Sequence, residues 1–250
     1  MQQSYQILLA SEFILALITF FSLFFISAPY GKFVRKGWGP IMKAKWGWMI
    51  MELPPVMFIL YFFLISEHSS TFIYIIFFLL WQSHYVHRSL IYPFKQSGKD
   101  RDFPMAIMLM AIFFNCINGF INGYEVFIYN TYSNDWLYTP QFIIGLTLFI
   151  SGYTINKQSD RILKNLRKPG ETDYKVPNGG MFKYVSAPHY LGEIIEWTGW
   201  AILTWSWSGL AFAVYTFANL APRAVSHHKW YFKKFKDYPG NRKALIPFIW

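Results

Sequence analysis

Titratable side chains within or beside strongly apolar segments are the residues of this sequence best placed to do chemistry. A charged or titratable group is costly in hydrocarbon, so each one suggests a functional site. Several of these residues recur three or four positions apart, which places them on one face of a helix. The groups are Glu52; His84, Tyr85, His87 and Arg88; Asn156, Asp160 and Arg167; Glu193 and Glu196; and Arg223, His227 and Tyr231.

The histidines allow an alternative in which this chemistry depends on a metal. Two pairs, at 84 and 87 and at 227 and 228, could begin the di-iron site of a membrane desaturase or hydroxylase. Such a site would need the glutamates named above as further ligands. Six histidines, of which His68 lies in an outer loop, are too few for a site built on imidazole alone. We therefore predict no metal site.

The composition identifies the kind of protein that carries these residues. Apolar and aromatic residues make up 54% of the 250 residues and aromatic residues alone 22%. Charged residues make up 14%, against roughly 25% in a soluble globular domain. Cys116 is the only cysteine, which excludes an internal disulfide and a cysteine-based metal cluster. The sequence predicts an all-α polytopic membrane protein with a single domain over residues 1–250.

Seven apolar stretches are the candidate membrane spans. Most of them approach the ~20 residues that a helix needs to cross the hydrocarbon core of a bilayer. The last two are shorter and share a tight break at 206–209. The predicted spans are 6–28, 47–66, 70–90, 104–128, 137–155, 189–206 and 208–222.

The distribution of basic residues predicts the orientation of these spans. All 23 Lys and Arg residues lie between spans one and two, at or after the end of span three, between spans five and six, or after span seven. The loops at 67–70 and 129–136 and the N-terminus contain none. The positive-inside rule then places the N-terminus outside and the C-terminus in the cytosol. The same rule accounts for the net charge of +10, so we predict no nucleic-acid partner.

With this orientation, the five groups of titratable residues lie in or near the cytosolic leaflet and converge at one depth. Glu12 and Glu125 lie nearer the outer side, where we expect them to serve helix packing or the rim of a cavity. The basic, turn-rich segment 157–188 suits an anionic ligand such as a phosphorylated cofactor. Because the usual glycine-rich nucleotide motifs are missing, such a ligand would need a pocket built from helix ends and loops.

Two long segments of the sequence resemble one family. RILKNLRKPGETDYKVPNGGMFKYVSAPHYLGEIIEW at 161–197 and YFKKFKDYPGNRKALIPFIW at 231–250 are similar to the C-terminal half of the steroid 5α-reductases. Shorter similarities lie upstream, in APYGK at 28–32, ELP at 52–54 and HYVHR at 84–88.

This resemblance implies an NADPH-dependent membrane reductase that acts on 3-oxo-Δ4 steroids. Glu52 and Tyr85 would be the catalytic residues and, with Met51, would bind the substrate. Many relatives have Gln at the position of Met51 and Asn where this chain has His189–Tyr190, which affects one expected contact at each site. The cofactor would be held by Tyr30, Arg88, Arg101, Asn156, Asp160, Arg167, Tyr174, His189, Glu193, Arg223, His227 and Tyr231.

The chemistry of enone reduction accounts for the catalytic pair independently. Addition of hydride to C5 places negative charge on the C3 oxygen, so catalysis needs donors arranged around that oxygen. A phenol beside a carboxylic acid kept neutral by apolar surroundings is one solution, used by ketosteroid isomerase. Tyr85 and a protonated Glu52 would form such a pair, whereas the sequence does not identify the source of the proton for C4.

Three alternatives stay open at the level of sequence. They are a reductase of sterols or enoyl thioesters, a transporter or receptor without enzymatic activity, and a membrane methyltransferase with a similar C-terminal pocket. The steroid would enter from the lipid phase, and we expect membrane lipid but no obligate protein as a partner. A bacterial protein would lie in the cytoplasmic membrane and a eukaryotic one in the endoplasmic reticulum membrane.

Overall fold

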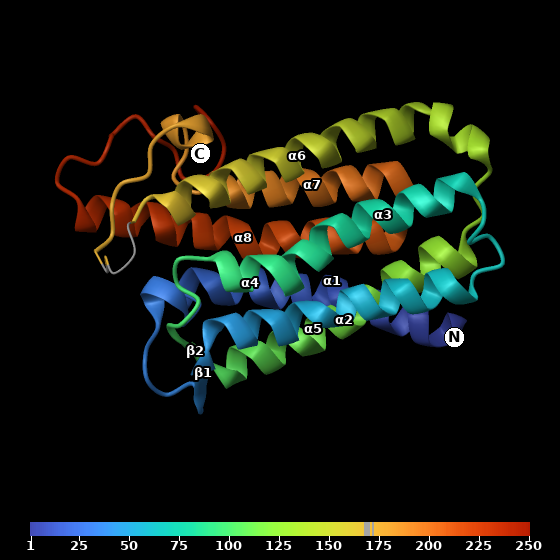
Figure 1. The fold of residues 1–250 in the computed structure, drawn as a ribbon, viewed down its shortest axis with the longest axis horizontal. Coiled ribbons are helices and arrows are strands. Elements are labelled where there is room, and N and C mark those ends of the chain that lie inside the picture. The colour runs from blue at the N-terminus through green and yellow to red at the C-terminus, as the bar shows by residue number, and fades with distance from the viewer. Residues whose placement is uncertain (168–170, 172) are drawn as a thin grey trace.

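Long helices that lie side by side along one direction dominate the computed structural model (Figure 1). The structure describes residues 1–167, 171 and 173–250. Lys168, Pro169 and Gly170, which belong to the LRKPGE sequence at 166–171, lie outside the described residues, as does Thr172. The helices are α1 Gln2–Phe25, α2 Ala44–Ile65, α3 Phe72–Val86, α4 Tyr92–Lys95, α5 Met105–Tyr124, α6 Pro140–Asn165, α7 Pro188–Thr204 and α8 Trp207–Lys234.

Single turns of π-helix extend two of these helices. One, His87–Ile91, joins α3 to α4, and the other, Glu125–Tyr129, follows α5. The short strands β1 Ile41–Lys43 and β2 Asp102–Pro104 pair antiparallel, with Met42 opposite Phe103. This pairing fixes the segment before α2 beside the segment before α5, at the same end of the molecule as the C-terminus (Figure 1).

Two helices continue further than the apolar pattern predicts. Span five was predicted to end at 155 and span seven at 222, but α6 reaches Asn165 and α8 reaches Lys234. The predicted loop 157–188 therefore begins as helix, which is a correction. The apolar pattern stops where side chains meet water, whereas backbone hydrogen bonding continues through polar residues. The tight break between α7 and α8 is present, with Trp205 in a left-handed conformation and Ser206 capping α8.

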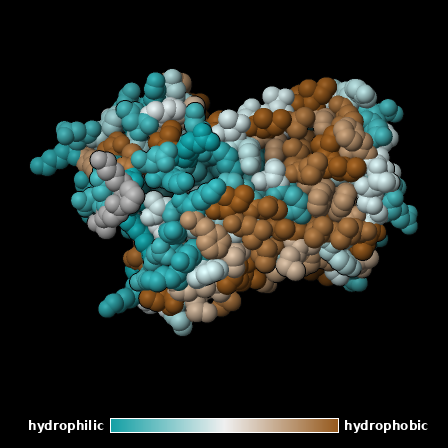
Figure 2. All heavy atoms as spheres, viewed as in Figure 1, coloured by the Kyte–Doolittle hydropathy of each residue, from teal (hydrophilic) through white to brown (hydrophobic). Residues whose placement is uncertain are grey.

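Within the part of the chain that the structure describes, three helical segments are long and apolar enough to cross a membrane: α1, α2, and α5 with its π-helical extension, Met105–Tyr129. Figure 2 shows apolar atoms along the helices and hydrophilic atoms gathered at the end with the strands and the C-terminus. The protein is therefore a mostly helical membrane protein. The helices α3 and α7 have only 15 and 17 residues, and α6 and α8 carry long polar ends.

Aromatic rings fill the core between the helices. Trp81 of α3 lies 5.2 Å from Trp197 and 5.1 Å from Trp200 of α7, measured between ring centroids. All three tryptophans are buried. Near the other end, Glu125 accepts hydrogen bonds from the backbone nitrogens of Trp207 (3.0 Å) and Ser208 (2.6 Å). The carboxyl of Glu125 thus satisfies the first turn of α8, in agreement with its predicted role in helix packing.

Glycines allow the backbones of α6 and α7 to approach closely. A side-chain carbon on Gly152 of α6 would meet the backbone of Glu196, and one on Gly192 of α7 would meet the backbone of Asn156. Small residues at such crossings are typical of helix packing in membranes. The close approach brings Asn156 of α6 beside the first turns of α7.

We expect Gly152→Ala to destabilise the fold, because the added carbon would overlap backbone atoms of α7. Backbone atoms, unlike the end of a flexible side chain, cannot move aside without shifting the helix. Overpacking of this kind costs about 1–3 kcal/mol. Thermal unfolding in detergent should therefore show a lower Tm than the wild type. Gly240→Ala is the matched control, since a carbon on Gly240 meets no atom within 4 Å. Equal Tm values for both variants would contradict the close packing of α6 and α7.

Candidate active site

One cavity of about 1270 Å³ brings together residues from position 15 to position 231. Its apolar part includes Leu15, Ile18, Phe113 and Phe212, and its polar part lies toward the basic loops. Every residue predicted to contact substrate or cofactor lines this cavity. They are Tyr30, Met51, Glu52, Tyr85, Arg88, Arg101, Asn156, Asp160, Arg167, Tyr174, His189, Glu193, Arg223, His227 and Tyr231.

A proline in α2, Pro55, explains how the backbone next to Glu52 is held. Pro55 has no N–H, so the carbonyl of Met51 loses the hydrogen bond that a helix would otherwise give it. The side-chain amide of Asn115, on α5, donates to that carbonyl instead. Asn115 also interacts with the Glu52 carboxyl, so α5 is fixed to α2 at this carboxyl.

Tyr85 enters the same region from α3. Its ring stacks on Trp81 at 5.0 Å and lies 5.5 Å from Trp197, and the residue is only 3% exposed. The hydroxyl accepts a hydrogen bond from Nδ2 of Asn118 at 3.3 Å and interacts electrostatically with Glu52. A carboxyl and a phenol therefore line the same cavity, and the aromatic rings of Trp81 and Trp197 hold the phenol in place.

Met51 lines the cavity as well but contributes a thioether, which is a weak hydrogen-bond acceptor.

Asn115 lies in the cavity wall and interacts with Glu52, but it was not predicted from the sequence. The sequence does contain a pattern that could have identified Asn115, because Asn115, Asn118 and Asn122 recur at helical spacing within the apolar stretch 104–128. A polar amide in such a segment needs a hydrogen-bond partner, which neighbouring helices commonly supply.

Arg88 is the central cation of the polar part. Its guanidinium lies 3.9 Å from carboxylate oxygens of both Asp160 and Glu193 and stacks over the rings of Trp48 and Tyr92 at 4.8 and 4.7 Å. Asp160 lies beyond the predicted end of span five. Burial raises the pKa of Asp160 to about 6, although Arg88 acts in the opposite direction. The carboxyl of Asp160 is therefore poorly solvated and available to a hydrogen-bond donor.

Buried polar atoms beside Arg88 have unused hydrogen-bonding capacity. The amide nitrogen of Asn156 donates to the His189 carbonyl at 3.0 Å and approaches Glu193 at 3.4 Å. Among the described residues, Oδ1 of Asn156, Oδ2 of Asp160 and Nδ1 of His189 find no hydrogen-bond partner. Because buried polar groups are normally satisfied, these three atoms can form hydrogen bonds with a ligand or with water in the cavity.

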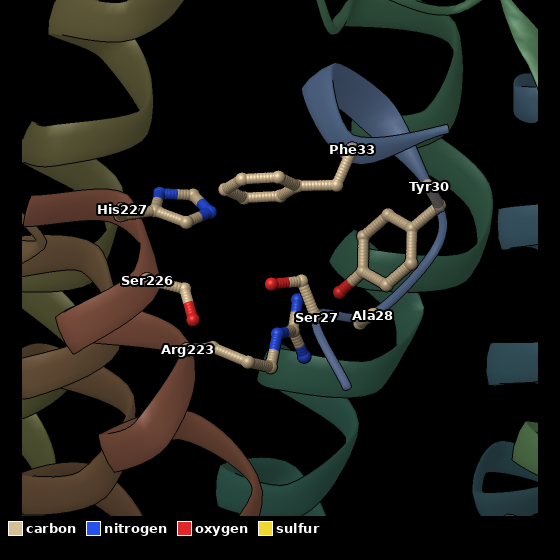
Figure 3. Close-up of a pocket in the computed structure, with 7 residues that line it drawn as sticks. All are labelled: Ser27, Ala28, Tyr30, Phe33, Arg223, Ser226 and His227. Atoms are coloured by element: carbon tan, nitrogen blue, oxygen red, sulfur yellow. The ribbon is translucent and has the colours of Figure 1, made fainter. Parts of the chain in front are cut away.

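The segment between α1 and α2 faces α8 across a small pocket (Figure 3). Tyr30 and Phe33 point from this loop toward Arg223 and His227. The Arg223 guanidinium stacks over Tyr30 at 4.8 Å and donates to the Tyr190 hydroxyl at 3.0 Å, and the ring of Phe33 lies 5.5 Å from that of His227. The predicted spacing of Arg223, His227 and Tyr231 on one helical face thus directs all three into the cavity.

Lys32 is a second residue that sequence reasoning did not assign to the site. Its ammonium lies 4.0 Å from the ring of Trp230 and 4.4 Å from that of Tyr231, and it lines the cavity. Burial lowers the pKa of Lys32 to about 7. The sequence offered its charge, which the positive-inside rule already explained, and its place in the APYGK similarity, which assigned it no role.

Three residues from two segments, one before α5 and one after α6, meet at the rim of the cavity. Arg101 donates to the Tyr174 hydroxyl at 2.5 Å, and Arg167 stacks over the Tyr174 ring at 5.2 Å. Arg167 also donates to Ser97 at 2.7 Å. The segment after α6 is therefore attached to the segment before α5, and its basic side chains face the polar part of the cavity.

Glu196 differs from its neighbour Glu193. The sequence predicted that both would share a face, but only Glu193 lines the cavity. Glu196 is buried and bonds to Nδ1 of His84 at 2.7 Å. Within the described part of the chain, no three His, Cys, Asp or Glu side chains form a group that could hold a metal ion.

Comparisons with known proteins identify the family of this chain. Residues 101–250 match the family described as 3-oxo-5-alpha-steroid 4-dehydrogenase. The steroid 5-alpha-reductase DET2 of Gossypium hirsutum is 42% identical over 97% of this chain and 96% of its own length. The 3-oxo-5-alpha-steroid 4-dehydrogenase 1 of Bos taurus is 39% identical over 95% of this chain and 94% of its own length. The enzyme of the same name from Homo sapiens is 41% identical over 89% of this chain and 86% of its own length.

These relatives are oxidoreductases of steroid metabolism, and the matches span both the residues around Glu52 and the C-terminal segments that first indicated the resemblance. The chain belongs to the 3-oxo-5-alpha-steroid 4-dehydrogenase family, the steroid 5-alpha-reductases.

Proposed function

We propose that this protein reduces the 4,5 double bond of 3-oxo-Δ4 steroids with NADPH as the reductant. The observation that carries the proposal is that one cavity is lined by a carboxyl and a phenol, by apolar side chains and by several basic side chains. Its volume of about 1270 Å³ exceeds the ~300–1,000 Å³ typical of a pocket for one small ligand. Such a cavity suits a dinucleotide and a steroid together.

The polar part fits the chemistry of NADPH. The carboxamide of its nicotinamide offers both donors and an acceptor, which match the unsatisfied atoms of Asn156, Asp160 and His189. Arg101, Arg167 and Arg223, with Lys32, would bind the phosphate groups through charge-assisted hydrogen bonds. When bound, NADPH supplies a hydride for the carbon–carbon double bond.

The chain's own contribution to the reaction lies at the C3 oxygen of the steroid. Tyr85 and a protonated Glu52 would donate hydrogen bonds to this oxygen, which gains negative charge as C5 is reduced. The aromatic wall of Trp81 and Trp197 fixes the Tyr85 ring, and Asn115 fixes the backbone before Glu52. Donors that are held in place in this way stabilise the enolate without having to reorganise.

Product analysis tests this proposal directly. Purified protein is incubated with NADPH and, in parallel, with progesterone, a sterol enone and an enoyl-CoA. We expect the 4,5-reduced product from progesterone. Reduction of only one of the other two substrates would assign the cavity to a different alkene. A protein that binds no NADPH would favour a transporter or receptor.

Arg223 provides a test of the cofactor site that is independent of turnover. Arg223→Ala should weaken NADPH binding by about 1.5–3 kcal/mol, the contribution of a hydrogen bond to a charged group. Quenching of tryptophan fluorescence by NADPH gives the Kd, and Arg167→Ala should behave similarly. Lys233→Ala is the control, because it removes the same charge from an exposed position of α8. Wild-type affinity in both arginine variants would leave the basic residues with a role in topology only.

We further propose that all seven long helices span the membrane, with the N-terminus outside and the cavity rim in the cytosol. The distribution of the 23 basic residues supports this orientation. A membrane-impermeant maleimide should label Ser70→Cys in intact cells, and should label Asn178→Cys only after permeabilisation. Both substituted positions are exposed. The opposite labelling pattern would overturn the orientation. The steroid would then reach the apolar part of the cavity from the lipid phase.

A further inference from the structure

A chain of buried polar side chains leads from α7 through α5 to the Tyr85 hydroxyl. Nε1 of Trp200 donates to Oδ1 of Asn122 at 2.9 Å, Nδ2 of Asn122 donates to Oδ1 of Asn118 at 2.8 Å, and Nδ2 of Asn118 donates to the oxygen of Tyr85 at 3.3 Å. Trp200, Asn122 and Asn118 are completely buried.

The direction of this chain is fixed at the Trp200 end. An indole N–H can only donate, so Asn122 must present its carbonyl oxygen to Trp200. The amide nitrogen of Asn122 then faces Asn118, which must accept with its own oxygen and present its nitrogen to Tyr85. Each amide is thereby held in one of its two orientations. The Tyr85 oxygen receives a hydrogen bond, and its own O–H is left for an acceptor in the cavity that Tyr85 lines.

We propose that Asn118, Asn122 and Trp200 are positioning residues that hold Tyr85 as a hydrogen-bond donor toward the substrate oxygen. The inference rests on the proposed function, in which Tyr85 donates to the C3 oxygen. As that oxygen gains charge, the Tyr85 oxygen also becomes more negative, and the hydrogen bond from Asn118 strengthens. The dipoles of the three successive donors are aligned, so each bond polarises the next.

A purely structural role for these amides is the competing explanation. Asn122 also donates to the Asn118 carbonyl at 3.1 Å and lies 3.5 Å from the Ser208 carbonyl, so it contributes to the packing of α5. The two explanations differ in what happens when the Tyr85 hydroxyl is absent. A positioning role then has nothing left to act on, whereas a structural role is unaffected.

The test is a double-mutant cycle measured by product formation. Asn118→Leu removes the donor to Tyr85 at similar size and should lower kcat about three- to tenfold, with KM and NADPH affinity unchanged. In the Tyr85→Phe background the same substitution should have no further effect on kcat. Equal losses in both backgrounds, or wild-type kcat for Asn118→Leu, would overturn the inference.

A second variant keeps the test informative if Asn118→Leu protein does not fold. Trp200→Phe removes only the indole N–H at the start of the chain and should lower kcat about threefold, again only when Tyr85 is present. Trp136→Phe is the matched control, because the indole of Trp136 donates to the Leu203 carbonyl at 2.8 Å, away from Tyr85. We expect wild-type kcat for this control, and the same loss in both tryptophan variants would overturn the inference.

The outcome for the wild type separates this inference from the proposed function. A wild type that reduces no 3-oxo-Δ4 steroid overturns the proposed function as well, whereas additive losses in an active protein overturn only the positioning role.

Discussion

Tyr85→Phe protein is expected to bind NADPH with wild-type affinity and to reduce a 3-oxo-Δ4 steroid about 10²–10³-fold more slowly. The substitution keeps the ring that stacks on Trp81 at 5.0 Å, so the aromatic wall is preserved. Only the hydroxyl is lost, and with it one of the two donors to the oxygen that becomes negative. Because this interaction is much stronger in the transition state than with the ground-state ketone, kcat and kcat/KM should fall together.

Tyr132→Phe is the matched control for this prediction. Its hydroxyl is also buried and donates to the Thr204 carbonyl at 2.7 Å, but Tyr132 does not line the cavity. We expect the control to lose about 0.5–1.5 kcal/mol of stability and to keep its kcat. The catalytic assignment of Tyr85 would be wrong if both variants turned over steroid at the wild-type rate.

Much of the cavity wall could be predicted from the sequence because it depends on helical periodicity. Arg223, His227 and Tyr231 recur every four residues, and α8 continues through all of them into the cavity. Asn156 and Asp160 lie on α6 for the same reason. Charge and spacing were sufficient there because a regular helix fixes which side chains point the same way.

Residues whose roles depend on partners from other elements could not be assigned in this way. Glu193 and Glu196 share a helical spacing, yet only Glu193 lines the cavity, whereas Glu196 is buried against His84 of α3. Asn115 reaches the site because Pro55, on a different helix, releases the Met51 carbonyl. Lys32 belongs to the site only because its loop lies against Trp230 and Tyr231. Such pairings arise from packing between helices, which a single periodic pattern does not specify.

Glu52→Ala is expected to have the other large effect on turnover. It removes the second donor to the enolate oxygen and leaves a cavity beside Tyr85, so kcat and kcat/KM should fall by about 10²–10³. Glu52→Gln keeps both the shape and a hydrogen-bond donor, and its loss should be about tenfold at most. The difference between the two substitutions separates the hydrogen-bonding role of the carboxyl from its volume.

A structural role for Glu52 leads to the opposite pattern. Glu52 interacts electrostatically with Arg88, which also lies near Asp160 and Glu193, so its carboxyl could serve mainly to hold α2 against α3. In that case Glu52→Ala would unfold at lower temperature, while the fraction that folds would keep its specific activity. Turnover is therefore measured on protein first shown to bind NADPH, with Tm recorded for each variant. A folded Glu52→Ala protein that binds NADPH and turns over at the wild-type rate would exclude Glu52 from the chemistry, and would leave Tyr85 as the single donor to the C3 oxygen.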